Sequence, residues 1–133
     1  MQVIVCLGDR NGMCFGGRRQ SRDRVVSEKI LEIVGDARLW IHPYSANLFE
    51  NDVSGICADA DFLDRAENLD YCFVETDDIL EYLPKMQSLI VFRWNRQYPA
   101  DKFFPEVEEM HLCSTVDFPG NSHEKITMEV YAR

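Results

Sequence analysis

The residues best suited to chemistry lie in one glycine-rich stretch, GDRNGMCFGGRRQSRDR, which spans residues 8–24. It holds four of the chain's seven glycines and, from Arg10 on, five arginines against one aspartate. The arginine fork matches the geometry of phosphates and carboxylates, and glycine backbone can turn its N–H groups toward an anion. The stretch therefore predicts a loop that binds an anion or a partner, formed by Asn11, Gly12, Arg18, Arg19, Gln20, Ser21, Arg22 and Arg24.

The charge distribution leaves a second interpretation of these arginines open. Residues 10–24 carry a local charge of +4 in a chain of net charge −9, so the remainder carries −13. Residues 59–81 alone hold nine carboxylates against one arginine. Either the arginines bind an external ligand, or they pair with the chain's own carboxylates, with 59–81 as the first candidate segment. The acidic segment itself is either a solubilising face or a surface for a basic protein, and the net charge argues against general nucleic-acid binding.

Other familiar sites are not expected from the sequence. The glycine spacing is not followed by Gly-Lys-Ser/Thr, so it does not predict an ATP-binding P-loop. His42, His111 and His123 are scattered, and neither HExxH nor paired CxxC occurs, so no metal site is predicted. No signal peptide and no membrane-spanning run is visible, so we expect a cytoplasmic protein. The odd number of cysteines indicates free thiols, mostly buried: Cys6, Cys14, Cys57, Cys72 and Cys113.

The elements around the loop predict an α/β domain that covers residues 1–133. A continuous apolar strand at 2–7 precedes the loop, and a helix follows it, with Ser21 as N-cap, Asp23 in its first turn and Gly35 as its stop. Strands alternating with helices favour a sheet that is parallel at its centre, and a closing hairpin favours an antiparallel edge. Further strands are predicted at 38–42, 54–58, 71–74, 88–95, 110–116 and 125–131, helical turns at 44–49, and helices at 61–68 and 76–83.

Several of these segments resemble the dihydrofolate reductase family. Asn11-Gly12-Met13 after the first strand is similar to its mobile active-site loop, and Leu83-Pro84 before SLIVFRWN is similar to its "fLP" helix end. Residues 100–106 (ADKFFPE) resemble its "gDtyFPei" box, and residues 129–133 (EVYAR) resemble its "feiyeR" ending. The resemblance implies a three-layer sandwich with a mixed, mostly parallel sheet and a C-terminal antiparallel hairpin.

The chain departs from that family where the resemblance implies catalytic and cofactor residues. Arg18-Arg19-Gln20 replaces the Leu-Pro-Trp that faces the pterin, and the family's helix carboxylate aligns with Arg24, one place after Asp23. Glu75, Asp77 and Asp78 occupy the turn where the family presents bare backbone amides to the NADPH pyrophosphate. Carboxylates there would repel the phosphates. The sequence therefore favours a protein that is not an enzyme.

The functional hypothesis is a small non-catalytic binding protein on a dihydrofolate reductase-like scaffold, without a cofactor. It would bind a small anionic ligand or a protein partner through the arginine-rich loop and the acidic surface, as immunity or antitoxin proteins do. The alternative is a diverged NAD(P)H-dependent reductase that uses Asp23 as its acid and NADPH as its cofactor. A nuclease is the least favoured class, because no base or metal set is visible.

Overall fold

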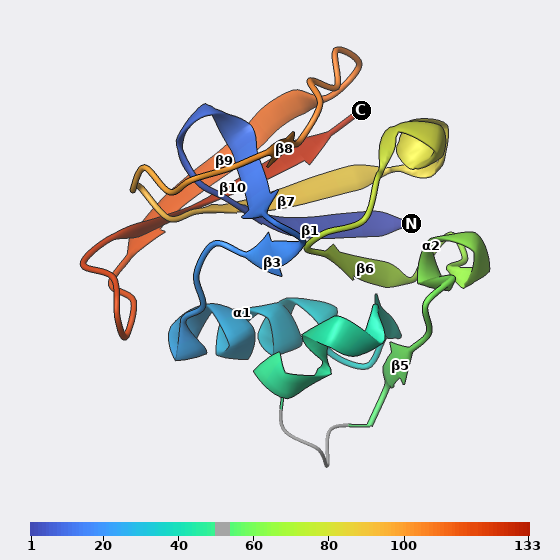
Figure 1. The fold of residues 1–133 in the computed structure, drawn as a ribbon. Coiled ribbons are helices and arrows are strands. Elements are labelled where there is room, and N and C mark those ends of the chain that lie inside the picture. Colours follow the sequence, from blue (N-terminus) through green and yellow to red (C-terminus); the bar gives the residue numbers. More distant parts are fainter. Residues whose placement is uncertain (50–53) are drawn as a thin grey trace.

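The main sheet confirms the predicted α/β architecture. The computed structural model describes residues 1–49 and 54–133, and within them the main sheet has seven strands in the order β5-β4-β6-β1-β7-β10-β9 (Figure 1). The first five of these run parallel, and β10 pairs antiparallel with both β7 and β9. The strands are β1 (Gln2–Leu7), β4 (Leu39–Ile41), β5 (Ile56–Ala58), β6 (Tyr71–Val74), β7 (Ser88–Arg93), β9 (His111–Phe118) and β10 (Ile126–Ala132).

One face of the sheet is covered by α1 (Arg24–Val34), which buries Val26, Ile30 and Val34. These residues pack with Ile4 of β1 and Phe92 of β7, so the helix stripe and alternate strand positions form one core. The helix ends at Gly35, whose φ of 55° lies in the left-handed region. Within the described residues, no helix is long and apolar enough to cross a membrane.

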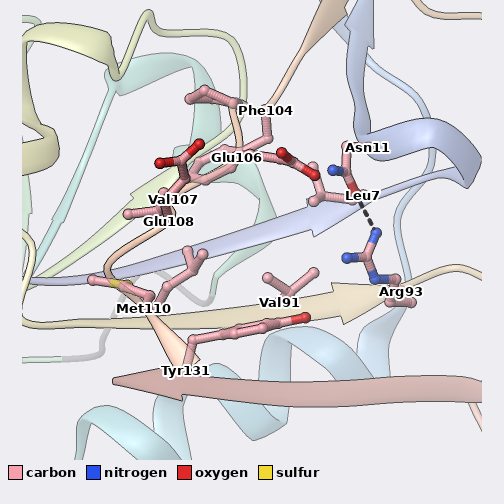
Figure 2. Close-up of a pocket in the computed structure, with 12 residues that line it drawn as sticks. Leu7, Asn11, Val91, Arg93, Phe104, Glu106, Val107, Glu108, Met110 and Tyr131 are labelled. Carbon is pink, nitrogen blue, oxygen red and sulfur yellow. Dashed lines mark hydrogen bonds between the residues drawn. The ribbon is translucent and has the colours of Figure 1, made fainter. Parts of the chain in front are cut away.

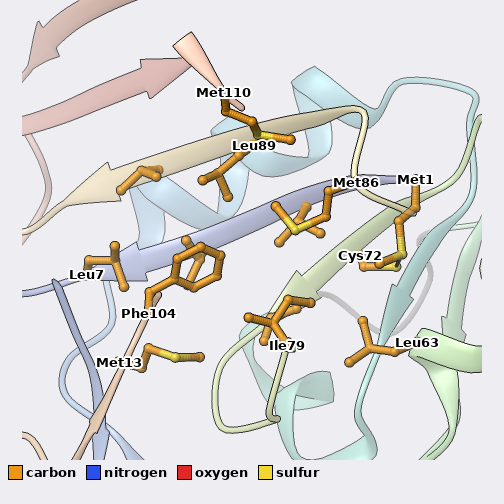
Figure 3. Packing of buried hydrophobic residues seen from close by; sticks show 14 of the residues in the cluster. Met1, Leu7, Met13, Leu63, Cys72, Ile79, Met86, Leu89, Phe104 and Met110 are labelled. Atoms are coloured by element: carbon orange, nitrogen blue, oxygen red, sulfur yellow. Dashed lines mark hydrogen bonds between the residues drawn. The ribbon is translucent and has the colours of Figure 1, made fainter. Parts of the chain in front are cut away.

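The opposite face carries a second core, which Figure 3 shows. Phe62 and Leu63 of the short helix α2 (Phe62–Arg65), Ile79 beside the 3₁₀ helix η3 (Leu80–Lys85), and Phe104 pack there on the odd-numbered residues of β1. The result is a three-layer arrangement with the sheet in the middle, as the family resemblance implied.

Two predicted helices on this second face are wrong in extent. The helix expected at 61–68 ends at Arg65, because the Asp70 carboxylate accepts the Glu67 N–H at 2.9 Å and closes a turn instead. No helix begins at Thr76: the chain forms only η3 from Leu80, with Pro84 inside it, and proline cannot donate the bond that an α-helix would need.

The predicted start of α1 is also wrong by two residues. Asp23, not Ser21, is the N-cap residue, and its side chain accepts the Val25 N–H at 2.9 Å. Asp23 therefore lies before the first turn and not within it.

The glycine-rich stretch is more ordered than the predicted loop. It forms β2 (Gly12–Phe15) and β3 (Arg18–Arg19), which join β8 (Lys102–Phe103) in a small sheet ordered β3-β2-β8. Gly16 and Gly17, with φ of 58° and 72°, make the two-residue turn between β2 and β3. This hairpin brings Arg19 toward the carboxyl ends of the parallel strands.

The helical turns predicted at 44–49 are found at η2 (Pro43–Leu48).

The cysteines were expected to be free and mostly buried. They are free, but only Cys14 and Cys72 are buried, and Cys113 is exposed on edge strand β9. An edge strand covered on neither face leaves its side chains in solvent, which explains the exposed thiol.

Candidate functional site

The carboxyl ends of the parallel strands, where open α/β sheets usually bind ligands, hold a buried ion pair. Arg19 Nε lies 2.8 Å from Glu75 Oε2, and Arg19 Nη2 lies 3.0 Å from Glu75 Oε1, a bidentate contact. Arg19 comes from β3 and Glu75 directly follows β6. The two side chains are only 15% and 8% exposed. One arginine of the loop thus pairs with the 59–81 segment.

Residues of η2 surround this ion pair. The Arg19 guanidinium lies over the Tyr44 ring, 4.4 Å from its centroid, and donates to the Tyr44 carbonyl at 3.2 Å. Ser45 Oγ donates to Glu75 Oε1 at 2.7 Å. The hydrogen bond to Glu75 raises the pKa of Arg19, so the guanidinium stays charged. The cavity left beside it measures about 10 Å³, which is space for one water molecule at most.

Asp23, the acid of the reductase alternative, is buried and fully hydrogen-bonded. Its carboxylate accepts the backbone N–H groups of Val25, Asn121 and Ser122 at 2.8–2.9 Å and lies 2.9 Å from His123 Nδ1. Burial acts to raise the pKa of Asp23, but these hydrogen bonds outweigh it and hold the pKa well below its usual range. Asp23 is therefore ionised at neutral pH and joins α1 to the β9–β10 connection.

His123 extends this network to Ser21. Its Nε2 lies 3.1 Å from Ser21 Oγ and 3.0 Å from Tyr98 OH, and its ring stacks on Trp94 with centroids 4.5 Å apart. The Asp–His–Ser order matches a nucleophile relay, but the cavity beside Ser21 is the one of about 10 Å³, too small for a substrate. Local sequence patterns do not predict this contact, because His123 lies about 100 positions from both partners.

Three further residues of the predicted binding set hold the loop in place. Asn11, in a left-handed conformation with φ of 63°, accepts a hydrogen bond from Arg93 Nη1 at 2.5 Å. Gly12 leaves no room for a Cβ, which would lie 2.7 Å from Gln20 Nε2. Gln20 Oε1 accepts the Gly8 N–H at 3.1 Å. These contacts are internal to the protein.

The remaining arginines of the predicted set take no part in the Arg19–Glu75 ion pair, although Arg22 and Arg19 both donate to Asn47. Arg18 is exposed on β3. Arg22 and Arg24 line a groove of about 350 Å³ beside the start of α1, together with Asn121 and Ser122. The eight predicted residues are therefore not gathered in one site, and only Arg22 and Arg24 share a cavity of useful size.

A larger hollow lies on the sheet face opposite α1 (Figure 2). It measures about 380 Å³ and has an apolar lining that includes Val91, Phe104 and Met110. At one end Arg93 donates to Glu129 Oε1 at 2.8 Å, and at the rim Glu106 is exposed. Of the eight residues predicted to bind a ligand, Asn11 alone is among those that line this hollow.

The elements on this same side carry exposed carboxylates, which we call the acidic face. Asp59, Glu67, Asp70 and Glu75 of the 59–81 segment are paired with arginines. The others project from α2, from the segment around η3 and from 104–110. Among the described residues, no ion pair is found for the members of the acidic face, which are Asp61, Asp64, Asp78, Glu81, Glu106 and Glu108.

Comparison with known proteins gives a structural likeness without a sequence match. No protein-family model and no curated protein matches this chain. The structure is similar to that of a dihydrofolate reductase from Enterococcus faecalis complexed with NADP(H) and RAB-propyl, with a TM-score of 0.67 and 12% identity. The match covers 99% of this chain and 95% of that chain. Identity this low bears on the fold alone, and the chain accordingly has a dihydrofolate reductase-like fold.

Proposed function

We propose that this protein is a non-catalytic binding protein whose acidic face takes a basic protein partner, in the manner of immunity or antitoxin proteins. The observation that carries the proposal is the Arg19–Glu75 ion pair at the carboxyl ends of the parallel strands. Because it leaves about 10 Å³ beside it, the space at the end of β6 is filled by the chain itself and does not admit a nucleotide or a pterin. Binding through the surface is then the better-supported activity.

The acidic face supports this proposal in charge and in shape. Glu106 and Glu108 line a hollow of about 380 Å³, and Asp78 lines another of about 210 Å³. Leu80 and Phe103 add apolar contact area there, at 59% and 52% exposure. On the α1 side, by contrast, Arg24 pairs with Glu28, and Lys29 lies over the Phe118 ring. A basic protein would therefore be attracted to one side of the molecule in preference to the other.

An anionic ligand of the arginine loop is the second candidate, on the basis of the groove lined by Arg22 and Arg24. Asp23 and Glu28 also line this groove, so a bound anion would face two carboxylates beside two arginines. Inorganic phosphate tests it: a saturable rise in melting temperature that Arg22→Gln abolishes would support this candidate.

Affinity capture from a lysate of the source organism tests the main proposal. The bait is the tagged full chain, compared with an Asp78→Lys/Glu81→Lys variant of the acidic face. A Glu32→Lys/Asp36→Lys variant is the matched control, because it makes the same charge change at exposed sites on the α1 side. We expect the wild type and the control to retain one basic protein, and the face variant to lose it. Capture of no protein, or equal capture by both variants, would refute the proposal.

A further inference from the structure

The smaller hollow on the acidic side has an unusual combination of linings. It measures about 210 Å³ and lies between β8 and the residues that lead into η3. This is below the roughly 300 Å³ at which pockets for drug-sized ligands begin, so the space suits a single side chain. Apolar residues line most of it, and the polar groups are two carboxylates and one amine. The lining consists of Met13, Ile79, Leu80, Phe103 and Pro105, with Asp77, Asp78 and Lys102.

Asp77 is the residue in this hollow that the fold does not explain. Among the described residues, its Oδ1 is the one buried side-chain oxygen or nitrogen without a hydrogen-bond partner. Burial raises the pKa of Asp77, the charges of His42 and Lys102 oppose that shift, and the charge of Glu75 adds to it. A buried carboxylate oxygen without a donor destabilises the folded protein, and such groups are concentrated at functional sites.

The apolar residues beside Asp77 define what kind of cation would fit. Phe103 and Leu80 are both more than half exposed and flank the hollow. An aromatic face attracts a planar guanidinium more readily than a compact ammonium, and the stem of an arginine packs on aliphatic groups. Lys102 Nζ donates to the Thr76 carbonyl at 2.7 Å, so the amine already present is engaged with the backbone.

We propose that this hollow receives an arginine side chain of the basic partner, whose guanidinium donates hydrogen bonds to Asp77 and Asp78 while its stem packs between Leu80 and Phe103. The inference rests on the proposed function, because it names the side chain that the acidic face recognises. Binding also balances the local charge, since two cations then face two carboxylates.

A titration with n-butylguanidinium, a mimic of the arginine side chain, tests the inference by ¹H–¹⁵N NMR on the full chain. We expect saturable shifts of the backbone amides of residues 76–80 and 102–104. Guanidinium chloride and 1-butanol, which carry only the head or only the stem, should bind more weakly, and n-butylammonium should also bind more weakly. Because charge-assisted hydrogen bonds are lost, Asp77→Asn should weaken the binding of n-butylguanidinium about tenfold.

Two further variants complete the test. Phe103→Ser removes the stacking surface while retaining Asp77, and should also weaken binding. Leu69→Ser, which removes an exposed side chain outside the hollow, should leave it unchanged. Absence of saturable shifts in the wild type, unchanged binding by Asp77→Asn or Phe103→Ser, or equal binding of n-butylammonium would overturn the inference. The affinity capture described above reports on the acidic face separately, so a failure of this inference can be told apart from a failure of the proposed function.

Discussion

Three acidic side chains differ in how far hydrogen bonds and ion pairs compensate their negative charge. Glu75 is neutralised by Arg19, and Asp23 is surrounded by five donors: three backbone N–H groups, the Ser122 hydroxyl and His123. Asp77 has a buried oxygen with no donor. The first two hold structure together, whereas the third reduces stability and remains available to an incoming cation. Glu75 and Asp23 therefore make contacts that stabilise the fold, and Asp77 is the carboxylate that we propose binds a cation.

Asp77→Asn should stabilise the protein at neutral pH. The folded-state pKa of Asp77 is raised above its ordinary value of 3.8. Below pH 3.8 Asp77 is protonated and costs the wild type no stability, and the free energy of unfolding falls as pH rises through the folded-state pKa. Asparagine does not ionise, so the gain should be near zero at acidic pH and about 1 kcal/mol at neutral pH. Urea unfolding of both proteins across this range measures it, and an equal difference at every pH would contradict the argument.

Glu75→Gln should destabilise the protein by about 3 kcal/mol, because it leaves Arg19 charged and largely buried without its partner. The double variant Arg19→Leu/Glu75→Leu should be less destabilised than Glu75→Gln, since no unpaired charge is left. Urea unfolding of the variants gives the comparison. A Glu75→Gln variant as stable as the wild type would mean that the ion pair does not close the space at the end of β6.

At the scale of elements, Asp23 joins α1 to the β9–β10 connection. Asp23 caps α1 and accepts the N–H groups of Asn121 and Ser122. Gly120 permits the close approach, since a Cβ there would lie 2.6 Å from Asp23 Oδ2. The hairpin is thus positioned by a contact about 100 residues distant in sequence.

Asp23→Ala should destabilise the protein by about 3 kcal/mol, because the cap and the hairpin contacts are lost together. Since the pKa of Asp23 is lowered, its contribution is present above pH 3.8 and is lost as pH falls toward the folded pKa. The variant should therefore show a weaker loss of stability below that pH than the wild type does. Acid titration followed by circular dichroism measures this, and identical acid transitions would disagree with the assigned role.

The sequence predicted the elements whose signals are local and long. Strands β1 and β7 are continuous apolar runs, and α1 has a helical apolar stripe ended by Gly35. The small sheet was not predicted, because β3 and β8 have two residues each and β8 joins β2 from nearly 90 positions away. Two helices were overestimated, because side-chain carboxylates and Pro84 decide those turns rather than apolar spacing.

For the candidate site, the sequence predicted two alternatives and could not decide between them. The charge pattern allowed the arginines either an external ligand or the 59–81 segment, and the structure pairs Arg19 with Glu75. Which carboxylates stay exposed depends on tertiary packing, as does the burial of one oxygen of Asp77. The sequence shows which residues are charged but not which of them pair, because ion pairs between distant residues depend on the fold.

At the scale of the whole molecule, the two sides of the main sheet differ in their exposed charge. The acidic face lies opposite α1, and exposed charges on α1 itself are of mixed sign. In a chain of net charge −9, this arrangement directs a basic protein toward one surface. The binding would depend on exposed charges, which are screened by salt.

Association with a short arginine–leucine peptide should therefore slow as ionic strength rises. The effect should be smaller for Asp78→Lys/Glu81→Lys and unchanged for Glu32→Lys/Asp36→Lys, because only the first pair belongs to the acidic face. Stopped-flow association rates at several salt concentrations measure this. The same salt dependence in all three proteins would show that net charge, and not this face, attracts the peptide.

A thermal-shift titration of the wild type, with NADPH and with the arginine–leucine peptide in parallel, tests the proposed binding function most directly. A ligand that binds only the folded state stabilises it by about 2.7 kcal/mol at roughly 100 times its dissociation constant, which moves the melting temperature by several degrees. We predict a saturable rise with the peptide and none with NADPH, because Arg19 and Glu75 fill the space at the end of β6. A saturable rise with NADPH and none with the peptide would contradict the proposed binding function.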